Sequence, residues 1–262
     1  MSTPILAEAP EHAATGETVA IYADLRAALG VPLVNLVFRN MAAIPGCLSW
    51  AWSCLRPIYT GEAIHCAGAE MAALAATARL NAAPIDIEMP NVAVAATLES
   101  YIRANPINLM GLEILKRALA GAGGEDPPGT PAQVMPISAV LPMADIARLP
   151  AATVARLRDM AHILHGEDGP VIPSVFRHFA AAPRALDAIS QVMRDLKAGN
   201  QLDELGHRLA EHGRAAAARL RVQPPSPPNP ETMRVIESLA AILPSNMTKM
   251  TVVAVALRRV FA

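Results

Sequence analysis

The chain has 262 residues, a formal net charge of −1, 53% hydrophobic residues and only 3% aromatic residues. Its balanced, scattered charge leaves no basic surface of the kind that nucleic acids require. A core of Ala, Leu, Val, Ile and Met is typical of closely packed helices, and alternating apolar and polar residues are scarce. We therefore expect an all-α protein that does not bind nucleic acid.

The N-terminal residues include acids and no basic, apolar leader, so we expect no signal peptide. The most apolar stretch, residues 41–55, contains a Pro-Gly pair and is shorter than the ~20 residues that a membrane helix needs. We expect a cytoplasmic location and no contact with a membrane. The three cysteines fit neither a disulfide framework nor the spacing of a metal site, so we interpret them as structural thiols: Cys47, Cys54 and Cys66.

The first half of the chain is predicted to consist of a flexible N-terminal tail and a helical unit. Residues 1–15 lack a helical pattern, whereas residues 16–120 form the first helical repeat. Gly30 and Pro45 supply stop signals within it. Apolar periodicity predicts helices over residues 17–29, 34–43, 48–58, 63–81, 92–103 and 106–120.

The second half follows a linker rich in glycine and proline. Residues 121–136 have the composition of a connection between units. Residues 137–262 then form the second helical repeat. Its helices are predicted over residues 151–165, 174–182, 185–199, 203–221, 231–242 and 246–260.

The two units resemble each other at a constant offset of 138 positions. The segment PLVNLVFRNMAAIP begins at residue 32, and PVIPSVFRHFAAAP begins at residue 170. The same offset relates Pro106 to Pro244 and Asn108 to Asn246. Neither unit is large enough to bury a good core alone, so we predict that two tandem repeats pack as a pseudo-two-fold dimer. The groove between two such halves is a common place for a small-molecule site.

The paired prolines suggest two interpretations of the residues around them. A proline fits the first position of a helix, which would make Asn105 an N-cap and place Asn108 and Asn246 in first turns. These asparagines either cap the helices or, with the free backbone N–H groups, bind an anion in a shared cavity.

Charged residues in the repeated segments also allow more than one role. Arg39 and Arg177 are equivalent in the two repeats and either hold the two halves together or attract a carboxylate. His178 is either a structural residue or a base. The pair Glu167-Asp168, close to His165, forms either a solvated turn or a source of a general base.

Three segments together resemble the group I 2-haloacid dehalogenases, which act on both D- and L-substrates with inversion. They are GETVAIYADLRAALGVPLVNLVFRNMAAIPG at residues 16–46, ANP at 104–106 and HGEDGPVIPSVFRHFAAAP at 165–183. The resemblance extends over nearly the whole chain. It implies an all-α pseudo-dimer with a site between the repeats. It also implies that an aspartate activates a water that displaces halide directly, without a cofactor or a metal.

The resemblance assigns site residues position by position. The family's site asparagine corresponds to Asn105, and a tyrosine three residues later corresponds to Asn108. An aromatic pair that lines the family's pocket corresponds to Leu33 and Leu36.

The family's catalytic aspartate has no acidic counterpart in this sequence. Alignment on Phe176 places Val175 at the aspartate position and Ser174 at its serine neighbour, whereas alignment on Gly169-Pro170 places Pro173 there. Valine cannot accept a proton from water. Either Asp168 or Glu167 supplies the base, or the chain does not dehalogenate.

These residues lead to a functional expectation with two alternatives. We expect a haloacid dehalogenase-like hydrolase that binds a small carboxylic acid between the repeats, as a monomer or a homodimer. The expected binding residues are Leu33, Leu36, Asn105, Asn108, Ser174, Val175 and Asn246. The first alternative is a relative that has lost dehalogenation and binds or converts another small molecule. The second is a helical interaction protein without a small-molecule site.

Overall fold

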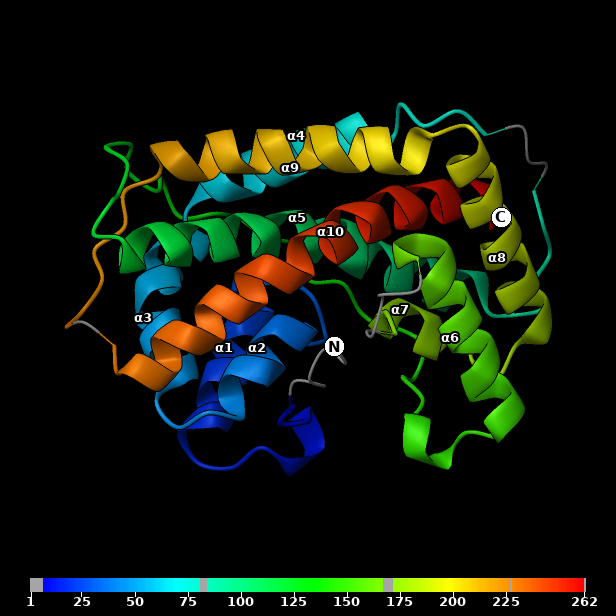
Figure 1. Ribbon diagram of the computed structural model, residues 1–262, viewed down its shortest axis with the longest axis horizontal. Coiled ribbons are helices and arrows are strands. Elements are labelled where there is room, and N and C mark those ends of the chain that lie inside the picture. The colour runs from blue at the N-terminus through cyan, green and yellow to red at the C-terminus, as the bar shows by residue number, and fades with distance from the viewer. Residues whose placement is uncertain (1–6, 81–83, 167–171, 227, 262) are drawn as a thin grey trace.

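The computed structural model describes residues 7–80, 84–166, 172–226 and 228–261 (Figure 1). Within these ranges the chain forms ten α-helices, two short 3-10 helices and no β-strand. The prediction of an all-α protein is therefore confirmed. The helices of the first half are α1 (Glu17–Leu29), α2 (Leu36–Ala42), α3 (Cys47–Tyr59), α4 (Glu62–Ala75) and α5 (Asn91–Leu119). Those of the second half are α6 (Ala151–His165), α7 (Ser174–His178), α8 (Pro183–Ala198), α9 (Gln201–Arg219) and α10 (Pro230–Val260).

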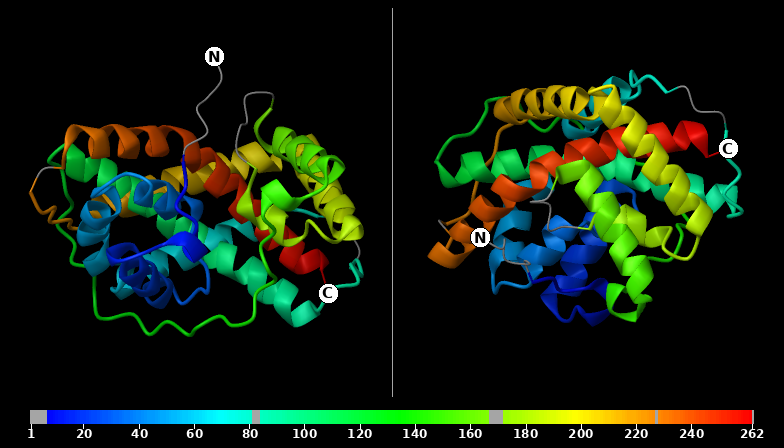
Figure 2. Two further views of the ribbon diagram at one scale, coloured as in Figure 1. Left: turned by 90° about the horizontal axis from the view of Figure 1, so that it is seen from below. Right: turned by 45° about the vertical axis from the view of Figure 1, so that its right-hand side comes forward.

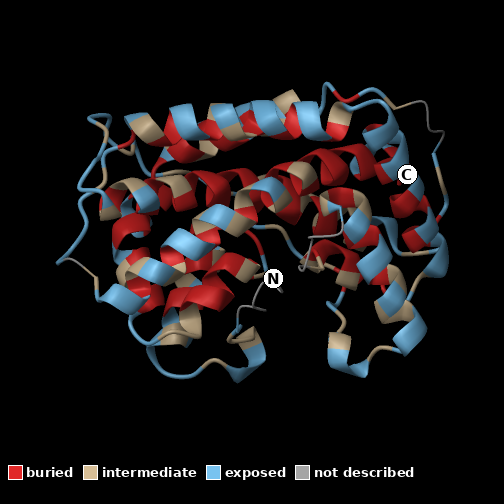
Figure 3. Ribbon diagram, viewed as in Figure 1, coloured by how far each residue is buried: buried red, intermediate tan, exposed pale blue. Residues whose placement is uncertain are grey.

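Two long helices form the centre of the molecule. α5 has 29 residues and α10 has 31, and they pack against each other and against α9 and α4. In Figure 1, α4 and α9 lie above this pair, α1–α3 lie towards the left below it, and α6–α8 lie towards the right. The buried residues concentrate along α5 and α10 (Figure 3). α10 is long and apolar enough to cross a membrane, but 61% of its most apolar window is buried in the protein, so core packing accounts for its composition.

Both long helices continue through a proline, which corrects the sequence prediction. The predicted breaks before Pro106 and Pro244 do not occur, since these prolines lie inside α5 and α10. A proline in a helix interior removes one backbone hydrogen bond and costs about 3 kcal/mol or more. Burial of one apolar face on both sides of each proline offsets this cost. Asn105, Asn108 and Asn246 are therefore mid-helix residues, and anion binding by free helix N-termini is wrong.

The order of helices supports the two-repeat organisation that we propose. α5 and α10 follow four shorter helices in each half, and their internal prolines differ by the offset of 138 positions. α2 and α7 likewise begin at Leu36 and Ser174, which are equivalent at this offset. Packing of the halves about a pseudo-two-fold axis remains a prediction, as do the boundaries of the two repeats.

The described part of the predicted N-terminal tail is held against the first half rather than loose. The backbone N–H of Ala9 donates to Arg39 O at 2.9 Å, and the hydroxyl of Tyr22 donates to Ala9 O at 2.8 Å. The side-chain amide of Asn40 donates to Ala7 O at 2.9 Å. We refer to residues 7–14 as the N-terminal strap. Its fixed position brings two glutamates, Glu8 and Glu11, beside α2.

The connection between the halves extends well beyond the predicted linker of residues 121–136. The left view of Figure 2 shows it as the long green segment along the edge of the molecule. It contains no α-helix between α5 and α6, only a 3-10 turn at Ile146–Arg148. Ile137 N–H donates to Gly30 O, and Leu141 N–H donates to Thr97 Oγ1, both at 2.9 Å. These bonds fix residues 140–143 over α5 as a wall of the site described next.

Candidate functional site

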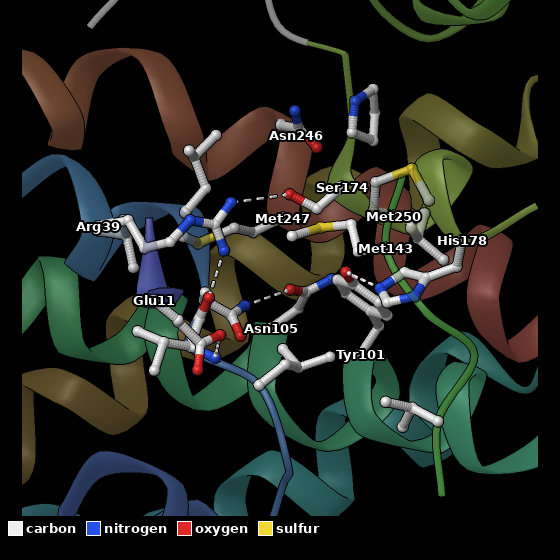
Figure 4. Close-up of a pocket in the computed structure, with 18 of the residues that line it drawn as sticks. Glu11, Arg39, Tyr101, Asn105, Met143, Ser174, His178, Asn246, Met247 and Met250 are labelled. Carbon is white, nitrogen blue, oxygen red and sulfur yellow. Dashed lines mark hydrogen bonds between the residues drawn. The ribbon is translucent and has the colours of Figure 1, made fainter. Parts of the chain in front are cut away.

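A cavity of about 270 Å³ lies where α2, α5, α7 and α10 meet. Residues 140–143 of the connection and Glu11 of the N-terminal strap complete its wall (Figure 4). Most of its surface is apolar, with methionines from α10 and leucines and valines from the segment before α2 and from α2 itself. A few polar groups converge on it from several elements, an arrangement typical of small-molecule sites.

Six of the seven expected binding residues line this cavity. Leu33 precedes α2, Leu36 begins it, and Asn105 projects from the middle of α5. The remaining three come from the second half: Ser174, Val175 and Asn246. The structure thus brings together residues that are distant in sequence.

Asn108 does not line the cavity, which corrects its assignment. Its side chain is buried in the core, where its Oδ1 accepts a hydrogen bond from the Tyr59 hydroxyl at 3.2 Å. Its Nδ2 has no partner among the described atoms. Asn108 and Asn105 differ by three positions, so they point to adjacent faces of α5, and only Asn105 reaches the cavity. The proposed substitute base Asp168 lies outside the described residues, together with Glu167.

Arg39 is a buried cation at the cavity wall. Its side chain is only 3% exposed. Nη1 donates to the carbonyl of Val34, and Nε donates to Glu8 Oε2 at 3.0 Å. Nη2 makes a longer contact of 3.4 Å with Ser174 Oγ (Figure 4). The five N–H donors of a guanidinium lie in one fixed plane. The donors of Arg39 that face Val34 and Glu8 have close partners, so the edge that faces Ser174 is the one available at the cavity.

Two asparagine side chains form a second polar feature. Asn35, the residue before α2, donates from Nδ2 to Asn105 Oδ1 at 3.0 Å. The Oδ1 of Asn35 is buried and has no hydrogen-bond partner among the described atoms. A buried carbonyl oxygen without a donor is costly, so this position at the cavity wall favours a water or a ligand that donates to it.

A hydrogen-bonded pair, Tyr101 and His178, forms the third polar feature of the cavity wall. Nδ1 of His178 lies 2.6 Å from the carbonyl of Leu141, which can only accept, so Nδ1 carries the proton. Nε2 therefore accepts from the Tyr101 hydroxyl at 3.1 Å. Burial lowers the pKa of His178 to about 4, so its imidazole is neutral near pH 7. Burial also raises the pKa of Tyr101, so its hydroxyl is protonated.

The described lining offers no ready general base. Val175 is 1% exposed and presents only an apolar side chain. Glu11 is an acid, but its carboxylate accepts from Arg26 Nη1 at 2.5 Å and from Val34 N–H at 2.8 Å. Neutral His178 is engaged at both nitrogens. Chemically, these groups are better suited to holding a polar, anionic ligand than to removing a proton from water.

Several lining residues gave no signal in the sequence. Asn35 has no polar counterpart in the second repeat, where the equivalent residue is Pro173. Tyr101 lies within an ordinary helical pattern, and Leu141 lies in a segment without helical periodicity. The polar groups of these residues, including the backbone carbonyl of Leu141, form part of a site only because the fold brings their elements together. Arg39 and His178 stood out in the sequence, because they belong to the repeated segments, but their roles remained open.

The comparisons with known proteins agree on fold and go no further. No family model matches the sequence, and no curated protein matches it. A D-2-haloacid dehalogenase mutant superposes with a TM-score of 0.82 at 17% identity, covering 97% of this chain and 95% of the other. A mutant complex with D-2-CPA gives 0.78 at 17% identity over 97% and 95% of the two chains. A D-2-haloacid dehalogenase complex with L-LA gives 0.80 at 17% identity over 99% of each chain. The all-α fold that the sequence resemblance implies is therefore confirmed: this chain has the helical fold of the D-2-haloacid dehalogenase structures, which cover 97–99% of its length.

Proposed function

We propose that this protein is a haloacid dehalogenase-like hydrolase that binds a small carboxylic acid in the cavity between α2, α5, α7 and α10. The observation that carries the proposal is Arg39, a nearly inaccessible cation at the wall of a mostly apolar cavity. A desolvated guanidinium is stabilised by an anion that accepts from its planar donors, and a carboxylate fits that geometry.

The size and polarity of the cavity favour a short acid. Its volume of about 270 Å³ accommodates a few carbon atoms beside a carboxylate. The edge of Arg39 that faces Ser174 would hold the carboxylate, because its present contact there is a long one of 3.4 Å. Leu33, Leu36 and Val175 would surround the carbon chain, and the amides of Asn105 and Asn246 would supply neutral donors and acceptors.

The reaction suggested by the likeness in fold is displacement of halide from the acid by water. The free Oδ1 of Asn35, beside Asn105, is a suitable position to accept a hydrogen bond from that water. Removal of its proton needs a base, and Val175 cannot act as one. The proposal therefore predicts that the acid binds but that a carbon–halogen bond is hydrolysed slowly, unless Asp168 supplies the carboxylate.

One observation favours the alternative of a relative that has lost dehalogenation. Val175 is fully buried against the cavity, at the position to which the resemblance assigns the aspartate. Such a protein would use the same polar groups of the cavity to bind or convert another small molecule. A helical interaction protein without a ligand is a weaker candidate, since it gives no reason for Arg39, Asn35 and Asn105 to converge on a cavity. The location proposed with this function is the cytoplasm, consistent with three free cysteines.

Ligand-induced shifts of the melting temperature test the proposal. Propionate, both enantiomers of 2-chloropropionate and lactate should raise the melting temperature, whereas propionamide, which has the same shape without the charge, should not. Arg39→Lys should reduce the shift because it removes the planar donor edge. Arg103→Lys is the matched control, since Arg103 donates to the carbonyls of Gly30 and Met135 and does not line this cavity.

The outcomes separate the candidate functions. No shift with any of these carboxylates would exclude their binding and leave two candidates, a relative that binds a different small molecule and the interaction protein. Shifts with carboxylates but no chloride release from 2-chloropropionate would favour the relative that has lost dehalogenation. Rapid chloride release by the wild-type chain would favour a base outside the described lining.

A further inference from the structure

Two arginines from the two halves meet at one glutamate of the N-terminal strap. Nε of Arg39 donates to Glu8 Oε2 at 3.0 Å, and Nη1 of Arg177 lies 3.9 Å from Glu8 Oε1. Arg39 and Arg177 are equivalent at the offset of 138 positions, so each repeat contributes one cation. Glu8 thus bridges the halves beside the cavity that Arg39 lines.

The charges at this bridge do not balance. The side chains of Arg39 and Arg177 are 3% and 12% exposed, so both guanidinia are largely removed from water. Their other described hydrogen-bond partners here are neutral oxygens: Val34 O and Ser174 Oγ for Arg39, and Ala144 O for Arg177. Asp145 adds a weaker attraction to Arg177 without a direct ion pair. One carboxylate therefore serves two buried cations. Such a pair attracts a carboxylate strongly, because each desolvated guanidinium gains from a charged acceptor.

The bridging carboxylate is the more accessible member of the cluster. Glu8 is 34% exposed, and the backbone around it is held by hydrogen bonds at Ala7 and Ala9 that do not involve its side chain. Rotation of Glu8 into water would therefore release both arginines without unfolding the strap. A second carboxylate could then accept from the same donors at little electrostatic cost, because one anion replaces another.

We propose that Arg39 and Arg177 form the entry site for the carboxylate of the ligand, and that Glu8 competes with the ligand for this site. The inference rests on the proposed binding of a small acid and adds its route and its internal competitor. A carboxylate arriving from solvent meets the arginine pair first and displaces the side chain of Glu8. It then reaches the Ser174-facing edge of Arg39 inside the cavity. An acid can bind only while Glu8 is away from the two arginines. The apparent affinity for acids is therefore the intrinsic affinity multiplied by the fraction of time that the arginine pair is free.

The test compares the dissociation constant of propionate for the wild type and three variants by isothermal titration calorimetry. Glu8→Gln keeps the shape of the side chain but removes its charge, and it should bind propionate about ten-fold more tightly than the wild type. Glu204→Gln is the matched control, since Glu204 is exposed on α9 and its loss changes the net charge equally. It should bind like the wild type. Adding Arg177→Gln to Glu8→Gln should cancel the gain, and propionamide should not distinguish any of the variants.

The results separate this inference from the proposed function. Equal propionate affinity for the wild type and Glu8→Gln would overturn the competition while leaving acid binding in place. A gain for propionamide as large as that for propionate would overturn it also, because the effect would not depend on the carboxylate. Absence of propionate binding in every variant would overturn acid binding and the entry site together. If Glu8→Gln proves poorly folded, Glu8→Asp, which retracts the carboxylate, should give an intermediate gain, and wild-type affinity in that variant would count against the competition.

Discussion

The side-chain amides of Asn35 and Asn105 are joined by a hydrogen bond of 3.0 Å across 70 positions of the sequence. The bond connects the residue before α2 to the middle of α5, and both side chains line the cavity. It orients Asn35 so that its unpartnered Oδ1 remains available to water or ligand. This pair also explains why Asn105, and not its neighbour Asn108, belongs to the candidate site.

The two asparagines of α5 provide a matched test of the site. Asn105→Ala should weaken propionate binding about five- to ten-fold, since a lost hydrogen bond corresponds to about 1 kcal/mol. Asn108→Ala should leave the affinity unchanged but lower the free energy of unfolding by about 1–2 kcal/mol, because Tyr59 loses its side-chain acceptor in the core. Calorimetry and urea unfolding measure the two effects. Equal loss of affinity in both variants would contradict the placement of the cavity on one face of α5.

Position 175 should control the rate of dehalogenation. The wild-type chain is expected to release chloride from 2-chloropropionate at close to the buffer rate. Val175→Asp should raise the rate about 10²-fold or more, because a general base in an apolar cavity has a raised pKa and accepts a proton readily. Val175→Asn, of similar shape without a base, is the control and should remain inactive. High wild-type activity that Asp168→Asn abolishes would instead identify Asp168 as the base.

Packing of α3 against α5 depends on a glycine. A Cβ at Gly111 would collide with the hydroxyl of Tyr59, which is fully buried, so Gly111→Ala should lower the free energy of unfolding by about 1–3 kcal/mol. Gly206 is also inside a helix, but a Cβ there would meet Thr248 Oγ1 at 3.4 Å, an ordinary contact. Gly206→Ala should be neutral or stabilise by up to about 1 kcal/mol. Urea unfolding of the two variants provides the comparison, and a tolerated alanine at 111 would show that α3 and α5 can separate.

Stability should fall on acidification through the titration of His178. Its pKa is about 4 in the folded protein because of burial, against an ordinary value of 6.5. Between these values the unfolded chain binds a proton that the folded chain does not. The free energy of unfolding therefore decreases as the pH falls from 6.5 to 4, by up to about 3 kcal/mol for this group. Above pH 6.5 the imidazole is neutral in both the folded and the unfolded chain, so this group no longer lowers the free energy of unfolding.

Urea unfolding at several pH values between 4 and 6.5 measures this effect. His178→Gln should reduce the slope of stability against pH, whereas His207→Gln, at an exposed position on α9, should preserve it. His165 adds to the wild-type slope in the same direction, since burial also lowers its pKa to about 4. An unchanged slope in His178→Gln would show that this imidazole is not neutral in the folded protein.

Local signals in the sequence determined the class of fold and most of the helices. The predicted bounds of α1 and α6 match those observed, because each helix ends at a glycine with a positive φ, which other residues rarely adopt: Gly30 at φ 62° and Gly166 at φ 71°. Apolar periodicity within a helix acts over a few residues, so it is visible in the sequence. The repeat offset is visible in the sequence, and the resemblance to the dehalogenases implied that Leu33, Leu36, Ser174 and Val175 share one site.

Tertiary packing decided the rest. Whether a helix stops at Pro106 or continues through it depends on the apolar surface that the flanking turns bury, and this surface is supplied by other helices. Asn108 and Asn246 are equivalent in the two repeats, yet the first meets Tyr59 in the core and the second lines the cavity. The contacts of Glu8 and Asn35 likewise join distant segments. Their energies depend on which side chains the fold brings within hydrogen-bonding distance, and no local pattern encodes that proximity.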